Sequence, residues 1–118
     1  MNQDRRKFGS RSLLTAIGLL LAAAVTAGAY QRFSRVEAFD TDIWTIWRPA
    51  GDSRVVVNGD GDTDLDCYVY DLTGQLLGKD DDGTDYCIVD VWRGRSGNLK
   101  VHIVNLGDVY NRYELRVR

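Results

Sequence analysis

Downstream of residue 29 the chain consists of short runs in which apolar and polar residues alternate, separated by glycine, aspartate and asparagine. The clearest runs cover residues 65–70, 87–92, 99–104 and 112–118. Alternation with a period of two places the apolar side chains on one face of a β-strand, and no helical period is present in this part of the chain. Short runs of this kind, with turn residues between them, are typical of a β-sandwich. The sequence therefore predicts an all-β fold.

The first 29 residues have the composition of an export signal. Four positive charges precede an apolar segment at residues 13–25, and Ala27, Gly28 and Ala29 supply the small residues of a cleavage site. As a helix the segment is about 20 Å long, shorter than a bilayer core of about 30 Å. We therefore expect residues 1–29 to be a helical signal peptide that is cleaved, with an uncleaved anchor as the alternative. The sequence Arg-Arg-Lys-Phe at residues 5–8 also resembles a twin-arginine signal.

Residues 30–118 are expected to form one small secreted or periplasmic domain, with residues 31–35 as a flexible lead-in. This part has sixteen Asp and Glu against eleven Lys and Arg. An acidic balance argues against nucleic acid as a partner, because nucleic-acid binding requires a basic face. It also argues against adsorption to anionic lipid, so we expect contact with a membrane only if the leader is retained. We expect a monomer.

Cys67 and Cys87 are predicted to form one disulfide. If Leu65, Cys67 and Val69 point into the core, then Cys67 faces inward, and the run at residues 87–92 places Cys87 inward by the same alternation. Two cysteines in an exported chain indicate a disulfide. Closing a loop of about 20 residues contributes about 3 kcal/mol in the chain-entropy model.

Acidic residues are concentrated between Asp60 and Asp85, where Lys79 is the one basic residue. Closely spaced carboxylates repel one another, and Ca²⁺ is a hard cation that takes six to eight oxygen ligands. The pattern does not favour an EF-hand, because Leu65 stands where that loop has glycine, Asp71 stands where it has a bidentate glutamate, and no helix is expected before it. We expect instead that the disulfide brings two acidic loops together at one end of the sandwich. The candidate ligands of a structural Ca²⁺ are Asp60, Asp62, Asp64, Asp66, Asp80, Asp81 and Asp82.

The alternative interpretation needs no metal. Aspartate and asparagine are favoured turn residues, and acidic loops keep an exported domain soluble. Both interpretations of the acidic loops remain open on the sequence alone.

The sequence does not indicate an enzyme. His102 is the only histidine and lies in the middle of a predicted strand, and no Gly-x-Ser-x-Gly motif is present. Paired carboxylates leave a small hydrolase as a weaker alternative, but a domain of this size has little volume for a cleft. Trp92 shares the predicted outer face with Ile88 and is the candidate binding residue, because aromatic faces bind sugar rings and peptide surfaces.

Several short motifs in a fixed order resemble the bacterial pre-peptidase C-terminal domain family. The resemblance rests on Asp64-Leu65-Asp66 with Tyr68-Val69-Tyr70-Asp71, the turn at residues 73–77, the acidic loop at 80–82 and the run at 110–115. It implies a jelly-roll-like antiparallel β-sandwich of about seven to eight short strands over residues 30–118. The related collagen-binding domains bind Ca²⁺ near the start of the domain.

The expected function is that of an exported, non-catalytic β-sandwich module, calcium-stabilised if the acidic loops hold a metal. Its expected partner is an extracellular or periplasmic protein or polysaccharide. The resemblance implies an alternative, in which the domain acts in trans as an accessory to a secreted peptidase in secretion or folding.

Overall fold

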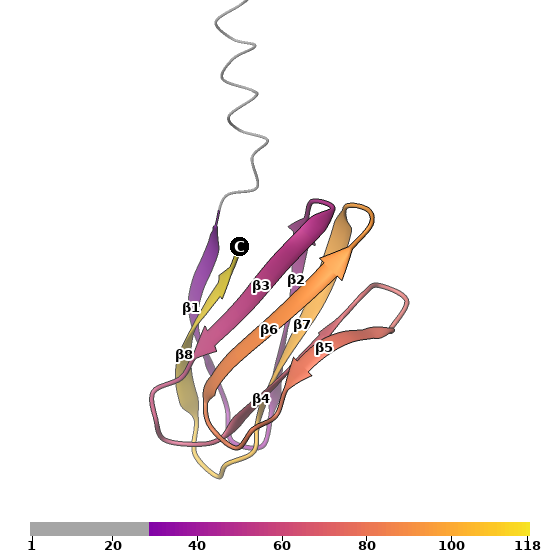
Figure 1. Ribbon diagram of the computed structural model, residues 1–118. Coiled ribbons are helices and arrows are strands. Elements are labelled where there is room, and N and C mark those ends of the chain that lie inside the picture. The colour runs from indigo at the N-terminus through magenta and orange to yellow at the C-terminus, as the bar shows by residue number, and fades with distance from the viewer. Residues whose placement is uncertain (1–28) are drawn as a thin grey trace, which may run out of the picture.

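The computed structural model describes residues 29–118, which form eight β-strands in two four-stranded antiparallel sheets (Figure 1). The predicted signal peptide, apart from Ala29, lies outside the described residues. Within the described part, no helix is long and apolar enough to cross a membrane. The strands are β1 (Tyr30–Val36), β2 (Thr41–Arg48), β3 (Gly51–Asn58), β4 (Leu65–Tyr70), β5 (Leu76–Asp80), β6 (Tyr86–Arg93), β7 (Gly97–Asn105) and β8 (Asn111–Val117).

The two sheets have the strand orders β1-β8-β3-β6 and β2-β7-β4-β5. An eight-stranded pair of sheets with this connectivity is a jelly roll, so the predicted fold class is confirmed. Every pairing is antiparallel. The loops that follow β1, β3, β5 and β7 therefore lie together at one end of the sandwich (Figure 1). The start of β1 and the end of β8 lie toward the opposite end.

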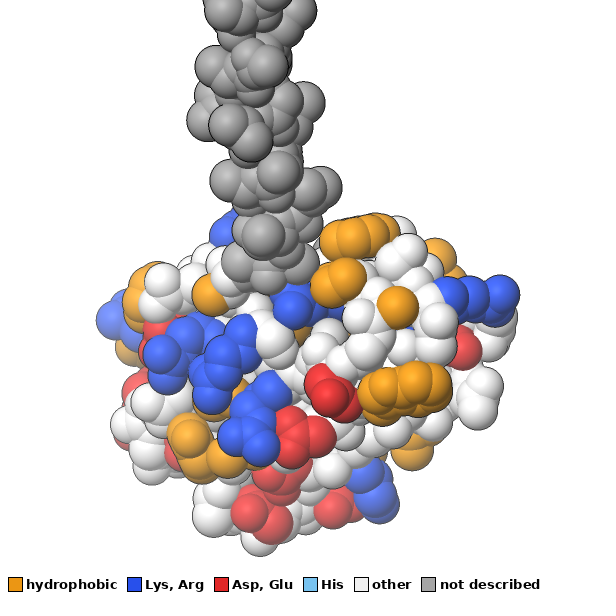
Figure 2. Space-filling view, turned by 45° about the horizontal axis from the view of Figure 1, so that its top comes forward, with side chains coloured by type: hydrophobic (Ala, Val, Ile, Leu, Met, Phe, Trp, Pro, Cys, Tyr) orange, Lys and Arg blue, Asp and Glu red, His pale blue; other side chains and the backbone are white. Residues whose placement is uncertain are grey.

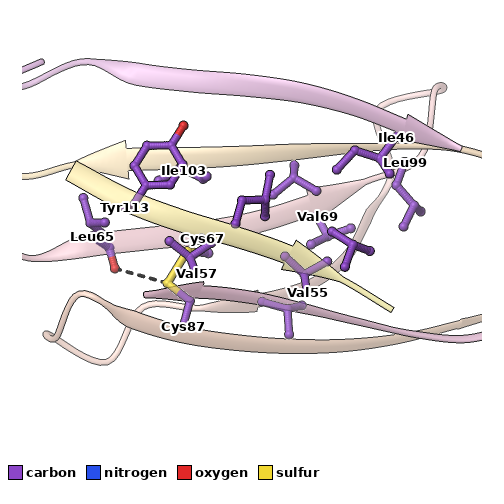
Figure 3. Close-up of a cluster of buried hydrophobic side chains, with 14 of the residues drawn as sticks. Ile46, Val55, Val57, Leu65, Cys67, Val69, Cys87, Leu99, Ile103 and Tyr113 are labelled. Atoms are coloured by element: carbon purple, nitrogen blue, oxygen red, sulfur yellow. Dashed lines mark hydrogen bonds between the residues drawn. A yellow bond between two sulfur atoms is a disulfide. The ribbon is translucent and has the colours of Figure 1, made fainter. Parts of the chain in front are cut away.

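The core lies between the sheets and is formed by the inward-facing residues of the alternating runs (Figure 3). Leu65, Cys67 and Val69 of β4 are fully buried, and the residues between them are only half-buried. Val89 and Val91 of β6 are buried in the same way. Burying a Val or Leu side chain contributes about 1.5 to 3 kcal/mol, so these faces fix the register of both sheets.

A disulfide between Cys67 of β4 and Cys87 of β6 links the two sheets through the core, and its Cα atoms are 6.2 Å apart (Figure 3). The Cys87 sulfur also lies 3.5 Å from the Leu65 carbonyl oxygen. The predicted pairing and the predicted inward direction of both side chains are confirmed.

The expectation of a flexible lead-in at residues 31–35 is wrong. These residues belong to β1, which pairs with β8 from Tyr30↔Val117 to Val36↔Asn111. The strand is difficult to recognise because it lies at the edge of its sheet, where Phe33 and both arginines of the strand are exposed and only Val36 is fully buried. An edge strand with one buried residue has no clear apolar alternation.

A hydrogen-bonded group of polar side chains lies between the sheets beside β1. The Trp44 indole nitrogen donates to the Tyr113 hydroxyl oxygen at 2.8 Å, and the Tyr113 hydroxyl donates to Asp42. Burial raises the pKa of Tyr113, and the hydrogen bond to Asp42 raises it further. Burial also raises the pKa of the Asp42 carboxyl, although its hydrogen bond with Tyr113 acts in the opposite direction. Each of these buried polar groups has a partner, as stability requires.

Candidate functional site

The four loops at one end of the sandwich carry negative charge only. Together they contain nine carboxylates and no Lys or Arg: two in loop 37–40, three in loop 59–64, three in loop 81–85 and one in loop 106–110. We call this surface the acidic end. Figure 2 shows red side chains across its lower part, away from the end of the sandwich at which β1 begins. The net charge of the protein is therefore distributed unevenly along the strand axis.

The two acidic loops that were expected to approach each other are in contact. The Gly59 amide donates to the Asp85 carbonyl at 2.9 Å, and the Leu65 amide donates to the Thr84 carbonyl at 3.2 Å. The Asp85 carboxylate accepts a further bond from the Gly61 amide at 2.6 Å. The expected proximity of loops 59–64 and 81–85 is confirmed.

Asn111 lies beneath these loops and is completely buried. Its Oδ1 accepts a hydrogen bond from the Asp60 amide at 3.1 Å. Its Nδ2 lies 3.1 Å from Asp85 Oδ2 and 3.0 Å from Thr63 Oγ1, and donates to both. One side chain at the start of β8 thus holds both acidic loops.

Asn105 performs the same role for the other two loops and is also buried. Its Nδ2 donates to the carbonyls of Glu37 at 3.1 Å and Val109 at 2.8 Å, and its Oδ1 accepts a bond from the Gly107 amide at 2.9 Å. Loops 37–40 and 106–110 are therefore joined through the last residue of β7.

An exposed apolar cluster formed by Phe39, Leu106 and Val109 lies among these carboxylates. Phe39 is 73% exposed, and its backbone has a φ of 55°, in the left-handed region that bulky residues seldom adopt. Its amide donates to the Gly107 carbonyl at 3.0 Å, which places it beside loop 106–110, where Leu106 and Val109 are also exposed. Strain of this kind is found preferentially at functional sites.

Most of the predicted calcium ligands have hydrogen-bonding or ionic partners in the structure. Asp60 accepts hydrogen bonds from the Arg112 amide at 2.8 Å and the Asp62 amide at 3.0 Å. Asp80 accepts a bond from the Ile88 amide at 2.9 Å. In the same way, Asp82 accepts bonds from the amide and hydroxyl of Thr84, and Asp81 forms an ion pair with Lys79 at 3.1 Å. The bonds within residues 60–62 and 82–84 are turn contacts, of the kind that the alternative interpretation of the acidic loops expects. The bonds from Arg112 and Ile88 join segments that are further apart in the chain.

Asp64 and Asp66 differ from the other candidates. The Oδ1 atom of each is buried and accepts no hydrogen bond within residues 29–118. Burial raises the pKa of both carboxyls; the charges of Asp82 and Asp85 add to the effect at Asp64, and the charge of Asp64 adds to it at Asp66. The other oxygen of Asp66, Oδ2, accepts a hydrogen bond from the Tyr68 hydroxyl at 3.3 Å, which lowers the pKa of Asp66 but does not outweigh burial. A buried carboxylate oxygen without a donor destabilises the ionised form.

Among residues 29–118, no three Asp, Glu, His or Cys side chains are placed so that they could hold a metal ion. Four of the candidate ligands, Asp60, Asp80, Asp81 and Asp82, have the partners described above, and Asp64 and Asp66 each have one buried carboxylate oxygen. The calcium site therefore stays a prediction.

Trp92, the predicted binding residue, lies far from the acidic end. It is 68% exposed on the outer face of β6, as is its neighbour Ile88 to a lesser degree, so the predicted face is confirmed. Trp92 borders two open depressions in the surface, of about 520 Å³ and about 370 Å³.

The chain matches no protein-family model and no curated protein sequence. A solved structure similar to it is that of PliG from Aeromonas hydrophila, a periplasmic inhibitor of g-type lysozyme. The two share 16% sequence identity with a TM-score of 0.57, over 78% of this chain and 86% of that chain. The likeness is one of fold. The resemblance to the pre-peptidase C-terminal domain family stays a prediction.

Three residues of the acidic end were not singled out by the sequence analysis, namely Phe39, Asn105 and Asn111. Nothing in the local sequence indicates the left-handed backbone of Phe39. The two asparagines did leave a signal, because each lies at a strand end beside the 106–110 loop. A buried asparagine at a strand end is well suited to bond loop backbone, since its amide both donates and accepts.

Proposed function

We propose that this protein is an exported, non-catalytic module that binds a protein with a positively charged surface through its acidic end. The observation that carries the proposal is the coincidence, on four adjacent loops, of nine carboxylates with an exposed apolar cluster. Apolar anchors provide most of the binding energy in protein interfaces, and surrounding charges provide specificity and speed of association.

The apolar anchor we propose is Phe39. Its side chain is exposed, and its backbone is held by the bond to the Gly107 carbonyl, so its position is fixed before a partner arrives. Leu106 and Val109 extend the apolar surface, while Glu37, Asp40 and Asp108 belong to the same loops. A partner that offers a pocket surrounded by Lys or Arg complements this arrangement.

The loops are also organised for binding without large rearrangement. The side chains of Asn105 and Asn111 take part in eight hydrogen bonds, with residues of all four loops and with the end of β1. Ordering flexible loops at an interface weakens binding, so loops that are already fixed favour affinity.

The first partner to test is a g-type lysozyme, because the similar fold of PliG belongs to an inhibitor of that enzyme. The assay is lysis of cell walls by the lysozyme in the presence of the purified protein, with the Kd measured by calorimetry at two salt concentrations. We expect inhibition, and a higher Kd at higher salt, because screening of the charges that steer the encounter slows association.

The structure provides a matched control for the anchor. Phe33 is 74% exposed on the outer face of β1, compared with 73% for Phe39, and it belongs to none of the four loops, although it borders a depression that also contains Gly59 and Asp60. We expect Phe39→Ala to weaken binding about 30-fold, the effect of losing a contact worth about 2 kcal/mol, and Phe33→Ala to leave it unchanged. Equal effects of the two substitutions on a bound partner would contradict the proposal.

A further inference from the structure

We infer that the surface around Trp92 is a second binding site, which takes a neutral, hydroxyl-rich glycan chain lying across the indole. The Trp92 site is distinct from the acidic end, and the inference does not depend on the function proposed for the acidic end. It is built from the outer face of β6, the neighbouring end of β3, Arg118 after β8 and the 94–96 loop.

The larger depression has aromatic and charged groups in fixed positions. Asp52 lies opposite Trp92 in the β3–β6 register, and Arg54 lies opposite Asp90. Arg54 binds the Asp90 carboxylate through two bonds, of 2.7 and 2.9 Å. Arg118 is placed beside them by two backbone hydrogen bonds with Arg54, at 2.6 and 3.0 Å.

The charges of this depression balance, with Arg54 and Arg118 against Asp52 and Asp90. The hydrogen bond from Arg54 lowers the pKa of Asp90, which keeps that carboxyl ionised. A charged ligand would be attracted and repelled equally by such a surface. A hydroxyl group both donates and accepts, so a row of hydroxyls complements carboxylates that only accept and guanidinium groups that only donate.

The smaller depression, on the other side of Trp92, continues the site. Two loops with internal hydrogen bonds form its walls. The Arg93 guanidinium donates to the Gly97 carbonyl at 2.7 Å, and Asp71 accepts bonds from the amides of Thr73 and Gln75, both at 2.9 Å. The indole leans toward the 94–96 loop, since a Cβ built on Gly94 would lie 3.5 Å from the Trp92 Cη2 atom.

The shape favours a glycan over a protein. Both depressions are open, so a ligand is covered on one side only, as a sugar ring stacked on an indole is. Protein hot spots lie in desolvated apolar surroundings, whereas the side chains that flank Trp92 in the larger depression are mostly charged. Two depressions separated by one ring fit a ligand of several sugar units.

The test is a titration of the purified protein with neutral oligosaccharides of glucose and of N-acetylglucosamine, from monosaccharide to hexasaccharide, followed by calorimetry and tryptophan fluorescence. We expect the Kd to fall by at least about tenfold from disaccharide to tetrasaccharide, as both depressions become filled. Trp92→Ala is expected to raise the Kd by at least about tenfold, and Trp92→Phe by much less, because the ring is retained.

The matched control is Trp47→Ala. Trp47 is 53% exposed on the outer face of β2, in the other sheet, and borders neither depression. We expect this variant, and Phe39→Ala at the acidic end, to bind the oligosaccharides like the wild type.

Three results would overturn the inference. One is a Kd weaker than about 10 mM for every neutral oligosaccharide, including the case in which an anionic polymer such as dextran sulfate binds instead. Another is equal loss of glycan binding in the Trp92 and Trp47 variants. The third is self-association that requires Trp92 without any glycan binding, which would make the surface a contact between copies of this chain.

Discussion

Replacement of Asn111 by aspartate should destabilise the protein in a strongly pH-dependent way. Asn111 Nδ2 lies 3.1 Å from Asp85 Oδ2 and 3.0 Å from Thr63 Oγ1, and it donates a hydrogen bond to each. Asn111 Oδ1 accepts a hydrogen bond from the Asp60 amide. Asn111→Ala removes these three bonds, each worth about 1 kcal/mol net, and should lower the free energy of unfolding by about 3 kcal/mol at any pH.

Asn111→Asp should do more harm at neutral pH, because it sets two carboxylates about 3 Å apart. Their repulsion is about 5 kcal/mol at an effective dielectric constant of about 20. Keeping one of the two carboxyls protonated at pH 7 costs only about 4 kcal/mol, which is less than the repulsion between two charged carboxylates. The pair therefore holds one proton, and the destabilisation beyond that of Asn111→Ala is limited to about 4 kcal/mol. It should decrease by about 1.4 kcal/mol per pH unit as the pH falls, and disappear near pH 4.

The assay is urea unfolding of the wild type and both variants from pH 7 to pH 4. A domain of this size is stable by roughly 4 to 13 kcal/mol, so Asn111→Asp is expected to be largely unfolded at pH 7 and to recover in acid. Asn98→Asp adds the same charge at the opposite end of the sandwich, and should change stability by less than about 1 kcal/mol. If the two Asn111 variants are equally stable at pH 7, or if their difference does not shrink in acid, the described contacts of Asn111 are incorrect.

Three further predictions concern stability. Replacing Cys67 and Cys87 together by alanine should lower the free energy of unfolding by about 3 kcal/mol, and the Tm in calorimetry by about 12–24 °C; a loss below about 4 °C would contradict the role of the disulfide. Burial raises the pKa of Asp64, so protonation stabilises the fold at low pH and this contribution is lost as the pH rises through the raised pKa. Asp64→Asn should therefore raise the Tm above that of the wild type at pH 7 in the presence of a chelator, and should give no gain near pH 4. A variant Tm below the wild-type Tm in chelator would refute this. A variant Tm below the wild-type Tm only in Ca²⁺ would support the predicted metal site. Gly59→Ala would place a Cβ 2.3 Å from an oxygen of the Asp85 carboxylate, and should lower the free energy of unfolding in urea by about 1–3 kcal/mol. The control is Gly94→Ala, whose Cβ would lie 3.5 Å from its nearest neighbour and should change the free energy of unfolding by less than about 0.5 kcal/mol. Equal effects of the two substitutions would contradict the close approach at Gly59.

The sequence predicted those parts of the fold that depend on one strand at a time. Alternation is a local property, so the inward faces of β4 and β6 could be assigned, and the two inward cysteines then predicted the link between the sheets. That link in turn predicted the contact between loops 59–64 and 81–85, which the structure contains.

The parts that could not be predicted depend on contacts between segments distant in sequence. β1 is a strand because β8 pairs with it, although its own residues are mostly polar. Asn105 and Asn111 bond loops that are up to 69 residues away in the chain. The exposure of Phe39 depends on the loop 106–110 beside it, and apolar residues in a β-rich sequence are otherwise expected in the core.

The overall composition also concealed the distribution of charge. A moderately acidic protein argues against anionic partners as a whole, but the negative charge here is concentrated on loops at one end, while the Trp92 depressions have nearly balanced charge. Conclusions about partners therefore apply to each surface separately.

The central claim, that the acidic end binds a basic protein through Phe39, is tested most directly by site-specific photocrosslinking in the cells that produce this protein. Phe39 and, as the matched control, Phe33 are each replaced by benzoylphenylalanine, and adducts are identified by mass spectrometry. We predict one discrete adduct from position 39 with a protein whose contact surface is rich in Lys and Arg, reduced at high salt. Its identity also distinguishes a lysozyme from the secreted peptidase that the family resemblance implies. The absence of an adduct at position 39, or the same adducts from positions 33 and 39, would contradict the claim.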